Sequence, residues 1–161
     1  MQTLQSQPSP VKLRTRVRRV AATLTAIFAV LFSGPLLTQT TSVQYVKLEA
    51  LAEMNGNPWS SMTEFNLLDT GGAVIPRTGW SVSADSVETQ AEDGSVANAI
   101  DGDLLTIWHT EWSTGSPPPP HSFVVNLGSP RAIGGFKYLP PPAGNPNGNI
   151  ASGACTPAST A

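Results

Sequence analysis

Apolar and polar residues alternate in short runs along most of the chain after position 42. In Val43–Met54, the apolar residues Val46, Leu48 and Ala50 alternate with polar ones, as in a strand with one face in a core. Further short runs follow at Phe65–Leu68, Trp80–Ser83, Ser122–Leu127 and Ile133–Tyr138. Turn-forming residues separate these runs, among them Gly128-Ser129-Pro130. The pattern predicts an all-β fold of about five short strands, an antiparallel sandwich or jelly roll.

Two stretches depart from this pattern. Val96–Ile100 is compact and apolar, and it predicts one helical turn before Asp101. Residues 151–161 are small or polar and have no periodicity, so they predict a disordered tail. Pro117–Pro120 predicts a rigid loop rather than a polyproline ligand.

A longer apolar run, Val20–Leu37, follows a basic segment that ends at Arg19. A basic segment before an apolar run is the layout of an export signal, and the run is near the lower limit for spanning a bilayer. No A-x-A cleavage site follows it. Residues 1–42 are therefore read as a cleaved signal peptide, an uncleaved signal anchor or a buried hydrophobic helix. Both export alternatives predict that residues 43 onward are secreted or at the cell surface, attached to a membrane only if the segment stays uncleaved.

The charge of the chain is unevenly distributed. Five of the nine basic residues precede position 20, whereas every acidic residue lies at or beyond Glu49. Beyond the leader, 4 basic and 11 acidic residues give a net charge of 4 − 11 = −7. Because nucleic-acid binding depends on neutralising phosphates with Lys and Arg, this balance argues against a nucleic-acid partner. The single cysteine, Cys155, cannot form an internal disulfide.

Two groups of residues carry candidate binding chemistry. Asp101 and Asp103 flank Gly102 on one tight turn, and such hard oxygen ligands suit Ca²⁺, although a metal-free Asx turn has the same sequence. His109 and Trp112 combine a polar side chain with an aromatic face, as sugar sites do. Buried aromatics and structural histidines remain the alternative. The neighbouring Trp108 is assigned to the core.

Catalytic motifs are missing from the sequence. It contains no G-x-S-x-G, H-E-x-x-H, phosphate-binding glycine loop or Cys/His cluster. His109 and His121 have no nearby nucleophile pattern, and two aspartates beside one glycine do not form the facing pair of a glycosidase. We therefore predict a non-catalytic protein.

Four sequence blocks occur in a recognisable order: ANAIDGD at 97–103, TIWHTEW at 106–112, PPHSFVVNLG at 119–128 and IGGFKY at 133–138. Together they resemble the discoidin family, the coagulation factor 5/8 type C domain, which is similar to family-32 carbohydrate-binding modules. The resemblance covers about Tyr45 to Ile150. It implies a galactose-binding-like jelly roll of eight strands with its ligand loops at one end.

The resemblance also implies two sites. A structural Ca²⁺ would be held by Asp101, Asp103, Thr106 and the Asn98 carbonyl. A sugar would be bound by His109, Trp112 and Asn147. In place of the arginine that such modules carry after the strand at 136–138, this chain has Pro140-Pro141-Pro142. The last aromatic residue of the sugar site would lie beyond Ala161, and the further acidic calcium ligand that the family takes from its C-terminal strands is absent, so the resemblance implies at best a partial sugar pocket.

The predicted organisation is a leader over 1–42, a partial discoidin-like domain over 43–150 and the tail over 151–161. A complete member of the family continues for several strands beyond the equivalent of Asn147-Gly148, so we expect a sandwich that is incomplete at its C-terminus. The predicted function is carbohydrate binding by an exported module, part of a larger carbohydrate-active or adhesion protein, with a glycan or polysaccharide as partner. The alternatives are a structural or adhesion domain that binds protein or phospholipid, and a truncated fragment without function.

Overall fold

The computed structural model describes residues 41–142, 145 and 147–159, so the predicted apolar leader helix lies outside the described residues. The described part is almost entirely β-structure. Its elements are β1 (Ser42–Glu53), β2 (Ser61–Met62), β3 (Glu64–Leu68), β4 (Ser81–Ala84), the 3₁₀ turn η1 (Val96–Ile100), β5 (Trp108–His109), β6 (His121–Ala132), β7 (Gly135–Leu139) and β8 (Ile150–Ala158). Across these residues, no helix has the length and apolar character needed to cross a membrane.

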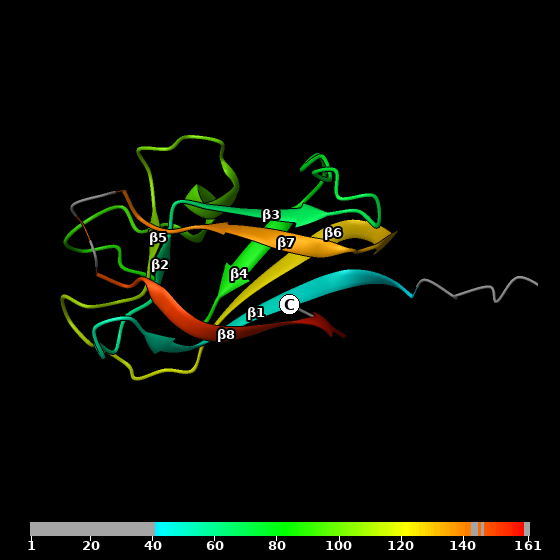
Figure 1. Cartoon of the computed structure of the whole chain (residues 1–161). Helices are drawn as coiled ribbons and strands as arrows, with labels where there is room; N and C mark the ends of the chain where they lie inside the picture. Colours follow the sequence, from blue (N-terminus) through cyan, green and yellow to red (C-terminus); the bar gives the residue numbers. More distant parts are fainter. Residues whose placement is uncertain (1–40, 143–144, 146, 160–161) are drawn as a thin grey trace, which may run out of the picture. The chain divides into compact units, whose positions relative to one another are not determined.

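The strands form an antiparallel sandwich, as predicted. One sheet has four strands in the order β4-β6-β1-β8, and β3 pairs with β7 in a second, two-stranded sheet. Figure 1 shows β3 and β7 lying across the larger sheet. The short pair β2-β5 lies at one end of the sandwich, among the loops that join the two sheets (Figure 1). This end, which we call the loop end, carries the candidate site.

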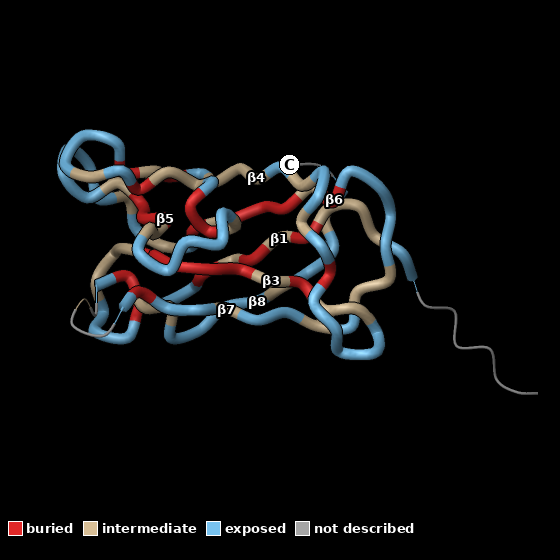
Figure 2. Tube along the Cα trace, turned by 90° about the horizontal axis from the view of Figure 1, so that it is seen from above, coloured by how far each residue is buried: buried red, intermediate tan, exposed pale blue. Residues whose placement is uncertain are grey.

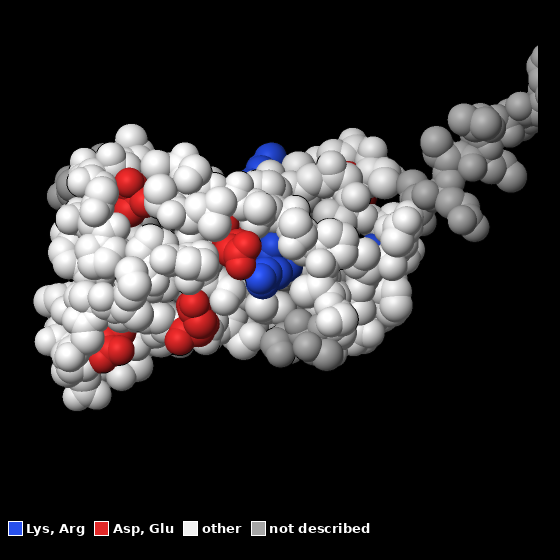
Figure 3. Space-filling model, turned by 90° about the horizontal axis from the view of Figure 1, so that it is seen from below, with Lys and Arg blue, Asp and Glu red and all other residues white. Residues whose placement is uncertain are grey.

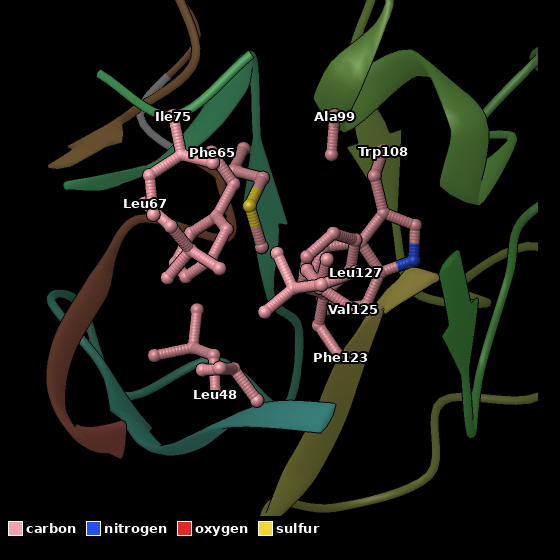
Figure 4. Packing of buried hydrophobic residues seen from close by; sticks show 11 residues of the cluster. Leu48, Phe65, Leu67, Ile75, Ala99, Trp108, Phe123, Val125 and Leu127 are labelled. Atoms are coloured by element: carbon pink, nitrogen blue, oxygen red, sulfur yellow. The ribbon is translucent and has the colours of Figure 1, made fainter. Parts of the chain in front are cut away.

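The core lies between the two sheets and explains the alternation in the sequence. Leu48 of β1, Phe65 and Leu67 of β3, and Phe123 of β6 are buried and point toward one another (Figure 4). In Figure 2, a buried stretch runs along β3, whereas β7 and β8 are largely exposed or half-buried. The Phe65 and Phe123 rings meet edge to face, with their centroids 5.4 Å apart. Trp108 packs on Phe123 at 5.5 Å, which confirms its assignment to the core. Each such burial stabilises the fold by about 1.5–3 kcal/mol.

Strand β8 differs from the predicted disordered tail, because residues 150–158 pair with β1. Cys155 lies opposite Leu48, and Ala154 opposite Glu49. A Cβ at Gly153 would lie 2.6 Å from the Glu49 carbonyl oxygen, so glycine permits this close approach. The small side chains carry no periodic signal, and the strand is recruited by the hydrogen-bonding edge that β1 presents.

The turn predicted at Gly128-Ser129-Pro130 is an irregularity inside β6. Tyr45 of β1 pairs with Asn126, whereas Val43 pairs with Arg131, so β6 bulges between these positions. Gly128 has a φ of 75°, which favours glycine. The strand therefore continues to Ala132 where the sequence predicted its end at Leu127.

Candidate functional site

A pocket of about 300 Å³ opens at the loop end of the sandwich. It is lined by Trp59, Glu92, His109, Trp112, Asn145 and Asn147. These residues come from segments far apart in the chain: the loop before β2, the loop after β4, strand β5 with the loop behind it, and the loop after β7. The structure thus brings together the three predicted sugar-binding residues, His109, Trp112 and Asn147, and adds three that the sequence analysis did not identify.

His109 has a defined hydrogen-bonding state. Its ring is buried, and its Nδ1 lies 2.6 Å from the carbonyl oxygen of Thr110. Because a carbonyl only accepts, Nδ1 carries the hydrogen, and in the neutral ring the lone pair is on Nε2. The Trp59 ring packs beside this imidazole at a tilt of 48°, with 6.5 Å between centroids. His109 therefore offers a hydrogen-bond acceptor next to an aromatic surface.

Trp112 is oriented by a carboxylate. Its indole Nε1 donates to Glu92 Oε1 over 3.0 Å, and the same oxygen lies 4.0 Å from His109 Nδ1. The Trp112 side chain stays 40% exposed despite this bond. An exposed indole that is held at its polar edge presents its apolar face without losing much rotamer freedom on binding.

Glu88 is a buried hub beneath the pocket. Its carboxylate accepts hydrogen bonds from the backbone N–H groups of Gln90, Ala91, Trp112 and Ser113 and from the Ser113 hydroxyl. The Trp112 N–H, followed by the other N–H groups and opposed by burial, holds the pKa of Glu88 well below its usual range. The ionised side chain thereby ties together the loops that carry Glu92 and Trp112.

The loop of Trp59 is held by two buried polar side chains. Glu53 accepts hydrogen bonds of 2.7 and 2.9 Å from backbone N–H groups of the turn that follows β1. His121 donates from Nε2 to the carbonyl oxygen of Pro58 over 2.7 Å. On the other side, the indole Nε1 of Trp59 donates to Ser116 Oγ over 3.3 Å. These contacts fix a second aromatic wall of the pocket, which the sequence analysis did not identify.

The Asn147 loop is attached to β2 through Ser61. Ser61 Oγ donates to the Asn147 carbonyl over 2.9 Å, and the Ser61 N–H donates to the Gly148 carbonyl over 2.8 Å. Gly148 has a φ of +79°, and a Cβ there would lie 2.5 Å from Ser61 Oγ. Only glycine combines this backbone conformation with this approach. The predicted position of Asn147 in the site therefore depends on its neighbour.

The predicted calcium loop is compact. Thr106 Oγ1 donates to Asp101 Oδ2 over 2.8 Å and to the Asp103 carbonyl over 3.1 Å. The Asp103 N–H donates to Asp101 Oδ1, as in an Asx turn. The Asn98 side-chain amide donates from Nδ2 to the backbone carbonyls of Asp93 and Ile107, which holds this residue beside the loop.

One acidic residue beside this loop was missed by the sequence analysis. Glu64 of β3 accepts a 2.7 Å hydrogen bond from the Gly102 N–H, and it also pairs with Arg77. Carboxylate, hydroxyl and carbonyl oxygens are ligands that suit Ca²⁺. The described residues contain no group of three or more His, Cys, Asp or Glu side chains that could hold a metal ion. Calcium binding by Asp101, Asp103, Thr106 and Asn98 stays a prediction.

Comparison with known proteins connects the fold to a family. Residues 79–154 match the model of the F5/8 type C domain. The chain contains an F5/8 type C domain. This confirms the discoidin-like resemblance of the four sequence blocks and agrees with the antiparallel sandwich.

Three curated relatives share parts of this chain. A galactose oxidase of Gibberella zeae is 35% identical over 99 residues, covering 59% of this chain and 14% of the relative. A sialidase of Micromonospora viridifaciens is 47% identical over 55 residues, covering 34% of this chain and 8% of the relative. An A type blood N-acetyl-alpha-D-galactosamine deacetylase of Flavonifractor plautii is 31% identical over 77 residues, covering 48% of this chain and 10% of the relative. The matched parts therefore span only a small share of each relative.

Strands β1 to β3 precede the segment that matches the F5/8 type C family. Nevertheless, β1 pairs with β6 and β3 pairs with β7, so the earlier strands complete the sandwich of the matched segment. Trp59 enters the pocket from this earlier part of the chain. The sequence analysis missed Trp59 because it is far along the chain from His109 and Trp112. The one available signal was its position in an Asn-Pro-Trp turn at the end of an alternating run.

Proposed function

We propose that this chain is a non-catalytic carbohydrate-binding module that holds one sugar residue of a glycan in the pocket lined by Trp59, His109 and Trp112. The convergence of two indole rings with polar side chains in one pocket carries this proposal. The relatives support it, because their names are those of a galactose oxidase, a sialidase and an N-acetylgalactosamine deacetylase.

The pocket supplies the contacts that a sugar ring needs. The indole rings of Trp59 and Trp112 offer apolar surfaces for the C–H faces of the ring. His109 Nε2 accepts from one hydroxyl, and the side-chain amides of Asn145 and Asn147 both donate and accept. A volume of about 300 Å³ is at the lower end for small-molecule sites and suits about one ring.

The carboxylates support binding without chemistry. Glu92 is the one carboxylate among the described residues that line the pocket, and the buried Glu88 is occupied by backbone N–H groups. A glycosidase needs two carboxylates that face each other across the scissile bond. The proposed module therefore binds its sugar and leaves it unchanged.

The wider context is proposed from the sequence. The leader over 1–42 would export the chain, either as a secreted protein or at the cell surface. The module would belong to a larger carbohydrate-active or adhesion protein and would target it to glycans. A Ca²⁺ held by Asp101, Asp103, Thr106 and the Asn98 carbonyl would brace the loop next to η1.

Binding of the full chain to a glycan array, followed by titration with the best glycan, tests the proposal. His109→Ala and Trp112→Ala should each weaken binding about tenfold or more, or about 1.4 kcal/mol. Leu51→Ala, an apolar side chain 49% exposed on β1 and outside the pocket, is the control and should bind as the wild type does.

Two results would contradict the proposal. The first is the absence of binding to any glycan by a chain that unfolds cooperatively. The second is glycan binding that survives both pocket substitutions. Binding to protein or phospholipid that is unaffected by both substitutions would favour an adhesion domain instead.

A further inference from the structure

Among the described residues that line the pocket, one carries a carboxylate and none is a lysine or an arginine. Glu92, whose side chain is 35% exposed, is the one charged residue that lines it in the described part of the chain. The residues of the neighbouring loop outside the described part are Ala143, Gly144 and Pro146, none of which has a charged side chain. On the face drawn in Figure 3, the loop end shows acidic side chains, and the basic ones lie farther along the sandwich.

The basic residues of the described part are placed elsewhere. Lys47 of β1 pairs with Glu49, and Arg77 pairs with Glu64 beside the calcium loop. Arg131 and Lys137 lie on β6 and β7, and neither lines the pocket. Within the described part of the chain, an anionic sugar in the pocket would therefore meet Glu92 without a compensating lysine or arginine.

Glu92 shares the pocket with two aromatic side chains. Oε1 accepts from the Trp112 indole, while no hydrogen bond to Oε2 occurs among the described residues. Trp59 and Trp112 add two indole rings to the same pocket. A carboxylate combined with aromatic faces is the chemistry that recognises an ammonium group, through a charge-assisted hydrogen bond and cation–π contact.

Glu88 adds to the negative potential. It accepts from the backbone N–H of Trp112, whose side chain donates to Glu92, so one residue connects both carboxylates. The lowered pKa of Glu88 keeps this buried group ionised at neutral pH. Salt screens a buried charge less than an exposed one, so its field persists in the pocket.

We infer that the pocket prefers glycans whose bound sugar carries a protonated amine, a deacetylated hexosamine, over N-acetylated, neutral or acidic sugars. This inference rests on the proposed carbohydrate binding and specifies its ligand class. The ammonium would bind Glu92 Oε2 and lie against the indole faces, while the sugar hydroxyls would use His109 and the asparagine amides.

The test compares matched glycosides. Dissociation constants of the full chain are measured at pH 7, where a sugar amine is still largely protonated and an ordinary imidazole is mostly neutral, for the methyl glycosides of galactosamine, N-acetylgalactosamine and galactose and for their gluco counterparts. The amino sugar should bind about fivefold more tightly than its N-acetyl and hydroxyl analogues, as expected for a partly exposed ion pair. The preference should decrease as salt is added.

Two variants assign the preference to Glu92. Glu92→Gln should bind all three sugars alike, because glutamine can still accept from the Trp112 indole but carries no charge. Glu49→Gln removes a carboxylate of nearly equal exposure (36%) on β1 and should keep the preference. Thermal unfolding of Glu92→Gln should match that of the wild type.

The outcomes separate this inference from the proposed function. Equal binding of amino, N-acetyl and neutral sugars overturns the amine preference and leaves carbohydrate binding standing. A preference that persists in Glu92→Gln also overturns it. If none of the glycosides binds and the glycan array is also negative, both proposals fail together.

Discussion

The backbone N–H of Trp112 donates to Oε2 of the buried Glu88 over 3.0 Å. This bond joins the exposed aromatic wall of the pocket to a carboxylate at the base of the loops. Four further hydrogen bonds reach the same carboxylate from residues 90, 91 and 113. The rigidity of the pocket therefore depends on a residue that does not line it.

Replacing Glu88 by Gln should loosen this hub. A neutral amide presents one acceptor oxygen where the carboxylate presents two, so buried N–H groups lose partners, and we expect a loss of about 1–3 kcal/mol in the free energy of unfolding. Glycan binding should weaken as well, because Trp112 and Glu92 are no longer held. Chemical denaturation and titration of the same preparations measure both effects.

The pH dependence of stability follows from the lowered pKa of Glu88. A carboxyl whose pKa is lower in the folded state contributes stability above its unfolded pKa and loses it as the pH falls toward the folded value. The difference in unfolding free energy between wild type and Glu88→Gln should be constant near neutrality and shrink below about pH 4.5. A difference that does not change with pH would exclude this role.

Gly148→Ala should move the Asn147 loop. The added Cβ would lie 2.5 Å from Ser61 Oγ and 2.7 Å from Ser61 N, at a φ of +79° that alanine rarely adopts. We expect a loss of stability of about 2–4 kcal/mol, combining backbone strain and overpacking, and weaker glycan binding.

Gly72→Ala is the matched control for that substitution. Gly72 has a φ of +84°, and a Cβ there would meet nothing within 4 Å. Gly72→Ala should lower the free energy of unfolding only by the backbone strain, about 1 kcal/mol, and should leave glycan binding intact. Equal effects of both substitutions would show that the contact with Ser61 is unimportant.

Trp59 tests whether the strands before the family match contribute to the site. Trp59→Ala should weaken glycan binding about tenfold, whereas Trp59→Phe, which keeps an aromatic face, should weaken it less. Titration with the glycan from the array measures both. Wild-type affinity in the alanine variant would place the sugar away from this wall of the pocket.

Calcium binding can be measured by thermal unfolding of the full chain. A ligand that binds only the folded state raises the midpoint, so millimolar Ca²⁺ should raise it for the wild type and not for Asp101→Asn. Asp69→Asn is the control, because Asp69 Oδ1 also caps a turn, through the N–H groups of Gly71 and Ala73. If the unfolding midpoint of the wild type does not change with calcium, the Asp101 loop is a metal-free Asx turn.

Cys155 reports on strand β8. Burial raises the pKa of its thiol to about 11, so at pH 8 alkylation should be about a hundredfold slower than for a free thiol and should accelerate as the pH rises. Ala154→Cys in a Cys155→Ser background puts the thiol at an exposed position of the same strand and should react fast. Equal rates at the two positions would indicate that β8 is not docked on β1.

The short apolar runs were sufficient to predict β1, β3, β4, β6 and β7 and the antiparallel sandwich, and the compact run at 96–100 predicted the helical turn that the structure shows as η1. Local periodicity carries this information because inward positions of a strand must be apolar. Four sequence blocks predicted the family, and three of the pocket residues, His109, Trp112 and Asn147, were named from the resemblance that the blocks carry. Strand β8 was not predicted, because its small residues have no pattern of their own and pair with an edge supplied by β1.

The remaining features were decided by tertiary structure. The pocket includes Trp59, Glu92 and Asn145, which come from loops that no sequence pattern connects with His109. Likewise, Glu64 of β3 contacts the Asp101 loop through the Gly102 N–H. Strand pairing between distant segments sets these positions. A sequence shows which side chains face a core, because burial follows from local alternation, but only the packing of the two sheets determines which loops meet at their end.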